Sequence, residues 1–444
     1  MSERSERTDR RGSERSERAG VRSSRPAVAT RAATGQAVVT GIGVVAPTGI
    51  GAAEHWATTL RGELRVSRIE EFDAGRYRTV LAGRVPAFTA AGYVEDRQAV
   101  QTDRWTHLAL AAARFALADA GYDPTAHDPY DTAVVLASGS GGNEFGQREI
   151  QALWQHGRRA VGAYQSIAWF YAASAGQVSI RHQTKGPSGV LVTEGAGGLD
   201  SLGEARRVIR RGTPAVLAGG TEAPLSPYAL ACQATGGRLS GAADPRAAYK
   251  PFDRRAGGNV PGEGGAVLLV EDLGRAAARG APRYGVIAGY GATHDAHHPQ
   301  DPPPDCTQYA RAMSLALADA GVSPTEVDLV VADGAGVPEL DRLEAEAVNR
   351  VFGAGAVPVT APAGLTGRLC SGGAALNVAT ALLAMRDGVV PAVGNLDDPD
   401  PASGLDLVCG APRELPVWTV LVGARGQGGF NSALVLRAAP EVAA

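Results

Sequence analysis

The sequence predicts an α/β fold made of two duplicated halves. Apolar runs typical of strands alternate along the chain with segments of helical apolar periodicity. Matched fragments also recur in the same order, namely VVTGIG (38–43) with VIAGYG (286–291), ALADAG (116–121 and 316–321), and GGAVLLVE (264–271) with FNSALVLR (430–437). Ordered matches of this kind indicate duplication of one unit. We therefore expect domains over residues 37–275 and 283–438, with helices on their sheets and the central helices back to back.

Composition excludes several classes of function. The chain has 444 residues, 44% of them hydrophobic, so it can bury a large core. Its net charge of −3 gives no general basic surface for nucleic acid, and no run approaches about 18 unbroken apolar residues, so we expect no membrane span. The four cysteines lack CxxC spacing and follow no secretory signal, which favours reduced thiols in the cytoplasm. We find no spacing that predicts a metal site or a cofactor.

The first 36 residues differ from the rest in composition. The segment is rich in Arg, Ser and Glu, repeats SERSER at 2–7 and 13–18, and has almost no apolar residue before Val21. Too little apolar surface is present to offset the entropy of ordering. We expect residues 1–36 to form a disordered tail.

The first strand signal, at residues 37–46, contains a weak nucleotide-binding pattern. Gly41, Gly43 and Ala46 fit G-x-G-x-x-A after a strand. Pro47 follows where a phosphate-binding helix would already be running, so we expect the helix to start near Ala52 and disfavour dinucleotide binding. A second helix is expected over residues 102–120, closed by a glycine and followed by a strand at 132–137.

Residues 189–212 predict a buried strand, a glycine-rich turn and an amphipathic helix. In many acyl-transferring enzymes such a turn presents a nucleophile above the helix N-terminus. Here the tip holds Gly195 and Ala196, with no Ser, Cys or Thr, and the neighbouring Glu194 would repel an incoming anion. Because active sites of α/β folds collect at strand ends, we expect this turn to meet those that follow Ala332 and Thr360.

These turns, together with residues 249–255 (YKPFDRR), 261–265 (PGEGG) and 428–432 (GGFNS), resemble the β-ketoacyl synthases of the thiolase fold. The resemblance covers residues 37–437 and implies a layered α-β-α-β-α core. In active members it places a nucleophilic Cys at 195, a His at 333 and at 368, and a Lys at 363. The thiol attacks an acyl thioester, and the imidazoles stabilise the charge formed as malonyl loses CO2. This chain instead has Gly195, Asp333, Arg368 and Ala363, so we expect no catalytic residue here.

The combination of turns is similar to the chain length factors, the ketosynthase β subunits of type II polyketide synthases that make antibiotics. This resemblance implies a heterodimer with a Cys-bearing ketosynthase α subunit, which elongates a malonyl-derived poly-β-ketone carried on the phosphopantetheine of an acyl carrier protein. The β subunit is expected to be non-catalytic and to control chain length by shaping the tunnel. Many members of this family have Gln where this chain has Gly195. A role of that amide in malonyl decarboxylation would therefore not apply here.

The resemblance also suggests which residues set the product length. If residues 143–154 form a helix, Asn143, Gly146 and Ile150 share one face. By resemblance this face lines the polyketide tunnel, and its modest side chains predict room for a long product. The alternative is ordinary helix packing, with the glycine permitting close approach.

Two other readings remain open from the sequence. The chain could be a stand-alone thiolase-fold acyltransferase, or a malonyl-carrier-protein decarboxylase, that uses a residue such as Glu194 or Cys370. It could also be a homodimeric protein that binds acyl chains. Turnover or a stable lipid-loaded homodimer would distinguish these readings from the heterodimer.

Overall fold

The computed structural model describes residues 35–440, so the predicted tail lies almost wholly outside the described residues. The first half contains the strands β1 (Ala37–Ala46), β2 (Gly49–Ile50), β3 (Val66–Arg68), β4 (Leu81–Gly83), β5 (Thr132–Ala137), β6 (Ser188–Leu191), β7 (Ala215–Glu222) and β8 (Gly264–Asp272). Its α-helices are α2 (Ala52–Leu60), α3 (Asp96–Gln101), α4 (Arg104–Ala120), α5 (Asn143–His156), α6 (Gln165–Ala168), α7 (Ala173–His182), α8 (Gly197–Arg210), α9 (Pro227–Ala234), α10 (Pro245–Ala248) and α11 (Leu273–Ala278).

The second half repeats the pattern with fewer elements. Its strands are β9 (Gly285–His294), β10 (Leu329–Val331), β11 (Pro358–Thr360), β12 (Val389–Val390), β13 (Asp406–Leu407), β14 (Arg413–Glu414), β15 (Thr419–Gly426) and β16 (Phe430–Arg437). Its α-helices are α12 (Thr307–Ala320), α13 (Pro338–Phe352) and α14 (Ser371–Asp387).

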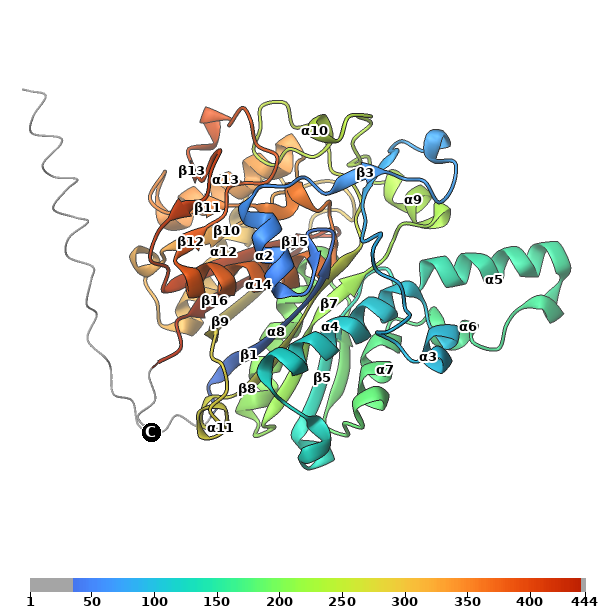
Figure 1. The fold of residues 1–444 in the computed structure, drawn as a ribbon. Coiled ribbons are helices and arrows are strands. Elements are labelled where there is room, and N and C mark those ends of the chain that lie inside the picture. The colour runs from blue at the N-terminus through green and yellow to red at the C-terminus, as the bar shows by residue number, and fades with distance from the viewer. Residues whose placement is uncertain (1–34, 441–444) are drawn as a thin grey trace, which may run out of the picture.

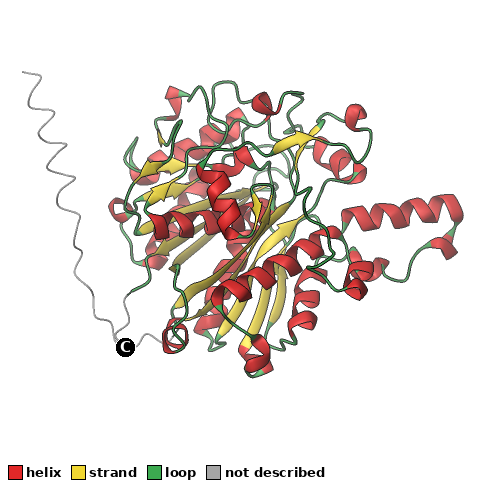
Figure 2. Cartoon of the chain, in the orientation of Figure 1, coloured by secondary structure: helices red, strands yellow, loops and turns green. Residues whose placement is uncertain are grey.

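The two halves have the same strand order and direction, which confirms the predicted duplication. In the first half the order is β6-β5-β7-β8-β1, with β5 parallel to β6 and β7 and with β8 antiparallel to β7 and β1. In the second half β11-β10-β15-β16-β9 repeats this arrangement, and β13 is added at the outer edge. A short pairing of β1 with β9 joins the halves into one mixed sheet (Figure 2).

Five layers follow from how the helices cover this sheet, as the predicted α-β-α-β-α core requires. Helices α8 and α14 pack against each other between the two halves, and their side chains share one core with strands from both. Helices α4 and α7 cover the outer face of the first half, and α12 and α13 cover that of the second (Figure 1). Strand residues therefore alternate between an inner and an outer core.

The glycine pattern of β1 serves helix packing. A Cβ atom added at Gly41 or Gly43 would run into backbone carbonyl groups of α4. The matched Gly289 and Gly291 of β9 lie against carbonyl groups of α12 in the same way. Glycine thus lets a helix approach the strand closely in each half. This shared packing role explains the repeated motif without a bound nucleotide.

The strand before the Gly195 turn departs from the prediction of a buried strand. Strand β6 pairs only with β5 and forms the sheet edge, so its residues are half-buried or exposed. Val192, which follows it, is 49% exposed. The prediction was wrong because an apolar run is equally typical of a core strand and of a strand that another chain covers.

Candidate functional site

Three turns from different parts of the chain meet at one place, as predicted. Gly195 lies in the turn before α8, Asp333 follows β10, and Arg368 precedes α14. The Arg368 Nη1 atom lies 3.0 Å from Asp333 Oδ2, and Nη2 donates to the carbonyl oxygen of Arg425 at 2.8 Å. Burial opposes the charge on Arg368, but Asp333 and Glu194 outweigh it and raise its pKa, so the guanidinium stays protonated.

Gly195 lies directly beneath this guanidinium. A Cβ atom built at Gly195 would be 2.9 Å from Arg368 Nη2 and closer still to the Arg425 carbonyl oxygen. No side chain fits at position 195 unless both the Arg425 backbone and the Arg368 side chain move. The volume that would hold a nucleophilic side chain is therefore closed by a backbone carbonyl and a guanidinium.

Glu194 has a structural role at this turn. Its backbone has φ of 51°, and its carboxylate accepts from the N–H of Gly195 at 2.6 Å and of Gln427 at 2.8 Å. Ser371 Oγ donates to its carbonyl oxygen at 2.7 Å. The carboxylate is thus committed to backbone donors, which does not favour Glu194 as an acyl acceptor.

Cys370 is also poorly suited to nucleophilic chemistry. Burial raises the pKa of its thiol well above the usual value, and the nearby Glu194 and Glu222 raise it further. The thiolate is the reactive form of cysteine, so the thiol is held in its unreactive state. The geometry therefore disfavours both candidate residues of an acyltransferase acting alone.

Ala363 lies beside the other degenerate positions. It lines a small cavity together with Asp333, Arg368 and His55. His55 hydrogen-bonds Thr48 Oγ1 at 2.7 Å on one ring nitrogen, and burial lowers its pKa to about 4, so the imidazole is neutral. The structure thus brings all four predicted positions together, around an arginine and an aspartate that neutralise each other.

Buried carboxylates of α13 hold the Asp333 turn in place. Glu344 accepts from the N–H of Asp333 at 2.8 Å and of Gly334 at 2.9 Å, and burial followed by the Asp333 charge raises its pKa. Asp341 accepts from the N–H of Phe252 at 2.9 Å and of Gly336 at 3.0 Å. Burial raises the pKa of Asp341 to about 8, against a usual value of 3.8.

This shift predicts a pH dependence of stability. With a raised carboxyl pKa the folded protein binds more protons than the unfolded chain, so the contribution of Asp341 is full below pH 3.8 and is lost as pH rises to about 8. We expect Asp341→Asn to flatten the decline in unfolding free energy between these values. Urea unfolding at several pH values measures the unfolding free energy. If its slope against pH is the same in Asp341→Asn as in the wild type, the prediction is wrong. Asp305→Asn, at an exposed carboxylate whose pKa is lowered, serves as the control.

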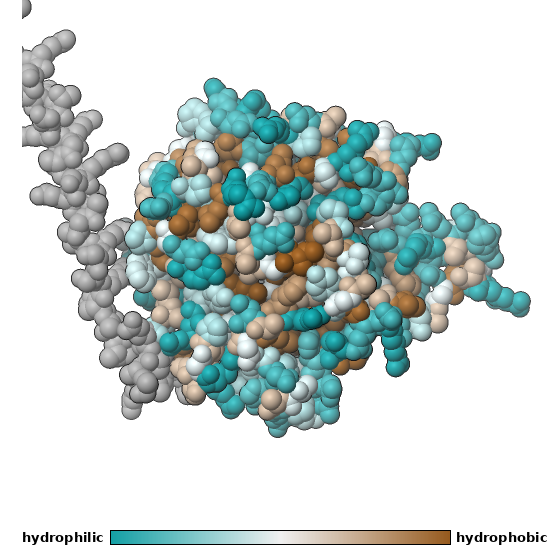
Figure 3. Space-filling model, viewed as in Figure 1, coloured by the Kyte–Doolittle hydropathy of each residue, from teal (hydrophilic) through white to brown (hydrophobic). Residues whose placement is uncertain are grey.

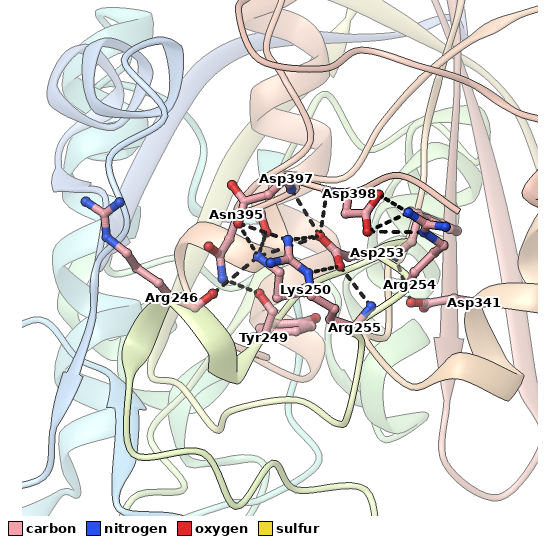
Figure 4. A network of polar contacts seen from close by, with 11 residues as sticks. Arg246, Tyr249, Lys250, Asp253, Arg254, Arg255, Asp341, Asn395, Asp397 and Asp398 are labelled. Carbon is pink, nitrogen blue, oxygen red and sulfur yellow. Dashed lines mark hydrogen bonds and ion pairs between the residues drawn. The ribbon is translucent and has the colours of Figure 1, made fainter. Parts of the chain in front are cut away.

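A polar network fixes the segment that carries the predicted YKPFDRR motif (Figure 4). Lys250, 3% exposed in its side chain, donates to Asp397 Oδ2 at 2.7 Å and lies 3.6 Å from Asp253 Oδ2. Asp253 also accepts from Arg255 Nε at 3.0 Å and from the backbone N–H of Asp398 at 2.9 Å. These contacts tie residues 249–255 to residues 395–398 next to the site.

The predicted gating residues lie on α5, which protrudes from the body of the molecule (Figure 1). Asn143 Nδ2 donates to the carbonyl oxygen of Ser140 at 2.9 Å, so its side chain turns back onto the preceding loop. Gly146 is buried, and a Cβ atom there would be 2.7 Å from Cδ1 of Trp169. Ile150 is 46% exposed. The three positions share the first turns of α5, but their side chains differ in surroundings.

Two further functional candidates were not singled out from the sequence. Glu222, wholly buried at the end of β7, accepts from the N–H of Ser140 at 3.2 Å and from Ser138 Oγ at 3.1 Å, and so fixes the loop before α5. In the sequence, Glu222 could have been recognised as an acidic residue at the end of the otherwise apolar segment 215–222. Trp169 packs against Gly146, and no local sequence pattern indicates this contact.

The sequence is similar to known β-ketoacyl synthases over most of its length. Residues 36–276 match the β-ketoacyl synthase N-terminal domain, and residues 284–397 match the C-terminal domain. The ketoacyl synthase β subunit of the tetracenomycin polyketide synthase from Streptomyces glaucescens is 54% identical over 402 residues, covering 90% of this chain and 98% of the relative.

Solved structures agree with these relatives. The ishigamide ketosynthase/chain length factor has a TM-score of 0.86 and 27% identity, covering 92% of this chain and 100% of that one. A second structure is a type II polyketide synthase acyl-carrier protein in complex with its ketosynthase bound to the hexaketide. It has a TM-score of 0.83 and 28% identity, covering 91% of this chain and 99% of that one. Among residues 35–440, no helix has the length and apolar character needed to cross a membrane.

Proposed function

This chain belongs to the β-ketoacyl synthase family, and from that premise we propose that it is the non-catalytic chain length factor of a type II polyketide synthase. It pairs with a Cys-bearing ketosynthase α subunit. The pair elongates a malonyl-derived poly-β-ketone on an acyl carrier protein, and this subunit shapes the tunnel that limits chain length. Full-length similarity to a ketosynthase β subunit supports the assignment.

The single observation that carries the proposal is the arginine over Gly195. Condensation needs a thiol that accepts the acyl group and donors that stabilise developing negative charge. Gly195 supplies no nucleophile, and the Arg368 guanidinium together with the Arg425 carbonyl oxygen leaves no room for a side chain there. Asp333 adds a negative charge and is paired with Arg368. The chemistry must therefore be done by a partner that has the thiol.

A direct test measures covalent loading. The purified chain alone is expected to acquire no label from a radioactive acyl thioester, whereas the co-expressed pair acquires it on the α subunit only. Synthesis of polyketide from malonyl-loaded carrier protein is expected to need both subunits. A stable acyl bond on this chain in the absence of its partner would overturn the proposal.

Exposed apolar side chains along one edge of the molecule support the partnership. Val192, next to edge strand β6, is 49% exposed, and Ile180 of the adjacent α7 is also exposed. Phe170, also exposed, adds aromatic surface near the α5 arm, and on this arm apolar and hydrophilic surface are interspersed (Figure 3). Obligate interfaces bury about 2,000 Å² or more and are rich in such side chains.

Charge placed on this edge is expected to break the heterodimer. Val192→Asp and Ile180→Asp should each weaken association by about 2–4 kcal/mol, or about 30- to 1,000-fold in Kd, because a carboxylate would be buried without a partner. Affinity purification followed by binding measurement checks this. Trp418→Asp is the control, since Trp418 is 55% exposed and immediately precedes β15 in the second half of the chain. Unchanged affinity for both edge variants would place the interface elsewhere.

The gating role of Asn143, Gly146 and Ile150 remains a proposal. Gly146→Phe is expected to shorten the main product by at least one malonyl-derived unit, because the phenyl ring must displace the Trp169 indole and so adds bulk to the wall of the tunnel. Mass spectrometry of the products of the reconstituted pair measures the length. An unchanged length would remove these α5 positions as the gate.

We also propose a cytoplasmic location and a division of the chain into halves at 37–275 and 283–438. The four cysteines are free thiols, as is usual for proteins of a reducing compartment. The repeated strand order supports the division, because each half contains one complete copy of it.

A further inference from the structure

Trp169 occupies the space that Gly146 leaves open. It follows α6 directly, and its indole Cδ1 lies 2.7 Å from the position of a Cβ atom on Gly146, with Nε1 at 3.3 Å. The indole is nevertheless 46% exposed in the isolated chain. One side of the ring therefore packs against Gly146 in the first turn of α5, while the rest of the ring is exposed.

The position of Trp169 is fixed by the backbone on both sides. Its carbonyl oxygen accepts from the N–H of Gly142 at 3.3 Å, and its own N–H donates to Gln165 at 3.3 Å. A Cβ atom on Gly141 would be 2.8 Å from the Trp169 carbonyl oxygen, and one on Gly142 would collide with Ala168. Because Gly141, Gly142 and Gly146 have no side chains, the end of α6 can approach α5 closely and the indole can pack against it.

The start of α5 is itself rigidly anchored. The buried Asp103 carboxylate accepts from the N–H of Phe145 at 2.7 Å, and Phe145 packs in the core under the Arg148 guanidinium, 5.1 Å from its ring centre. Asn143 is turned onto Ser140. Asn143 and Gly146 of the predicted gate therefore project little bulk, and the large rigid group beside Gly146 is the indole.

We propose that Trp169 determines product length in this chain, with its indole forming the stop against which the growing poly-β-ketone chain ends. The inference rests on the proposed function and deepens it, because the tunnel exists only with the ketosynthase partner. An indole presents a broad, rigid face, so it excludes the chain at little entropic cost. Removing the indole opens space beside Gly146, because the glycine has no side chain of its own to fill it.

The experiment uses the co-expressed heterodimer with its carrier protein and malonyl donor, and measures product masses. Trp169→Ala is expected to shift the main product to at least one further malonyl-derived unit, with Trp169→Phe giving a smaller shift. In the double variant Gly146→Phe with Trp169→Ala, the phenyl ring refills the space and the product returns toward its original length. Trp418→Ala is the control for loss of a half-exposed tryptophan elsewhere.

The outcomes separate this inference from the proposed function. If Trp169→Ala, Trp169→Phe and Trp169→Leu all pair with the α subunit and make product of unchanged length, Trp169 is not the stop, while the proposed function stands. If all three lose the partner, the indole is an interface anchor and the inference is wrong. If the α subunit makes the same product without this chain, the proposed function itself fails.

Discussion

Replacing Arg368 with alanine is expected to lower the free energy of unfolding by about 3–5 kcal/mol. Its side chain is mostly buried, and it pairs with the mostly buried Asp333 and donates to the Arg425 carbonyl oxygen. Removal leaves a buried carboxylate without its counter-charge and a carbonyl without a donor. Urea unfolding measures the loss. Arg342→Ala, which breaks an exposed pair with Glu346, should cost less than about 1 kcal/mol as the control.

The match between Arg368 and Gly195 gives a sharper test. Gly195→Gln is expected to destabilise the protein by about 1–3 kcal/mol, because the side chain collides with the guanidinium and with the Arg425 carbonyl. In the Arg368→Ala background the same change should cost less, since only the Arg425 backbone then obstructs the new side chain. A double-mutant cycle measures this coupling. Strictly additive costs would show that the two residues do not share one space.

Asp253→Ala is the second change with a large expected effect, again a loss of about 3–5 kcal/mol in unfolding free energy. Burial alone would raise the pKa of Asp253, but Arg255 and backbone N–H groups outweigh it and hold the pKa below its usual range. The carboxylate is charged and wholly buried, and its removal leaves the buried Lys250 ammonium with less counter-charge (Figure 4).

The control for this prediction lies in the same network. Arg254 pairs with Asp398 at 2.8 Å, but both side chains are well exposed, so Arg254→Ala should cost less than about 1 kcal/mol. Because the pKa of Asp253 is lowered, its contribution is present above the carboxyl's usual pKa and is lost as pH falls. The difference between wild type and Asp253→Ala should therefore shrink in acid, and a difference independent of pH would contradict the ionic explanation.

Local signals in the sequence were sufficient for the fold. Helix α4 ends at Gly121 in the left-handed conformation, and α12 ends likewise at Gly321, where the matched fragments predicted a shared unit. The α/β class, the duplication and the meeting of the three turns are confirmed. The α/β class follows from periodicity and glycine placement, which depend on residues near one another in the chain. The duplication follows from fragments repeated in the same order, and the meeting of the turns from the rule that active sites of α/β folds collect at strand ends.

Other features could not be predicted because they depend on contacts between distant segments. The apolar run ending at Val192 looks the same whether its own core or a partner chain covers it, and the structure places it at an edge. Gly146 indicated that another segment approaches α5 closely, but only the folded chain shows that this segment contains Trp169. Whether these residues set product length stays a prediction.

By itself the sequence determined the duplicated α/β fold and the lack of a nucleophile at position 195, because strand and helix periods and the identity of a residue are local properties. Only the tertiary structure decided that Arg368 fills the space over Gly195 and that an indole stands beside Gly146. Those arrangements arise where turns distant in sequence are packed together, and the volume available at each point depends on every segment that reaches it.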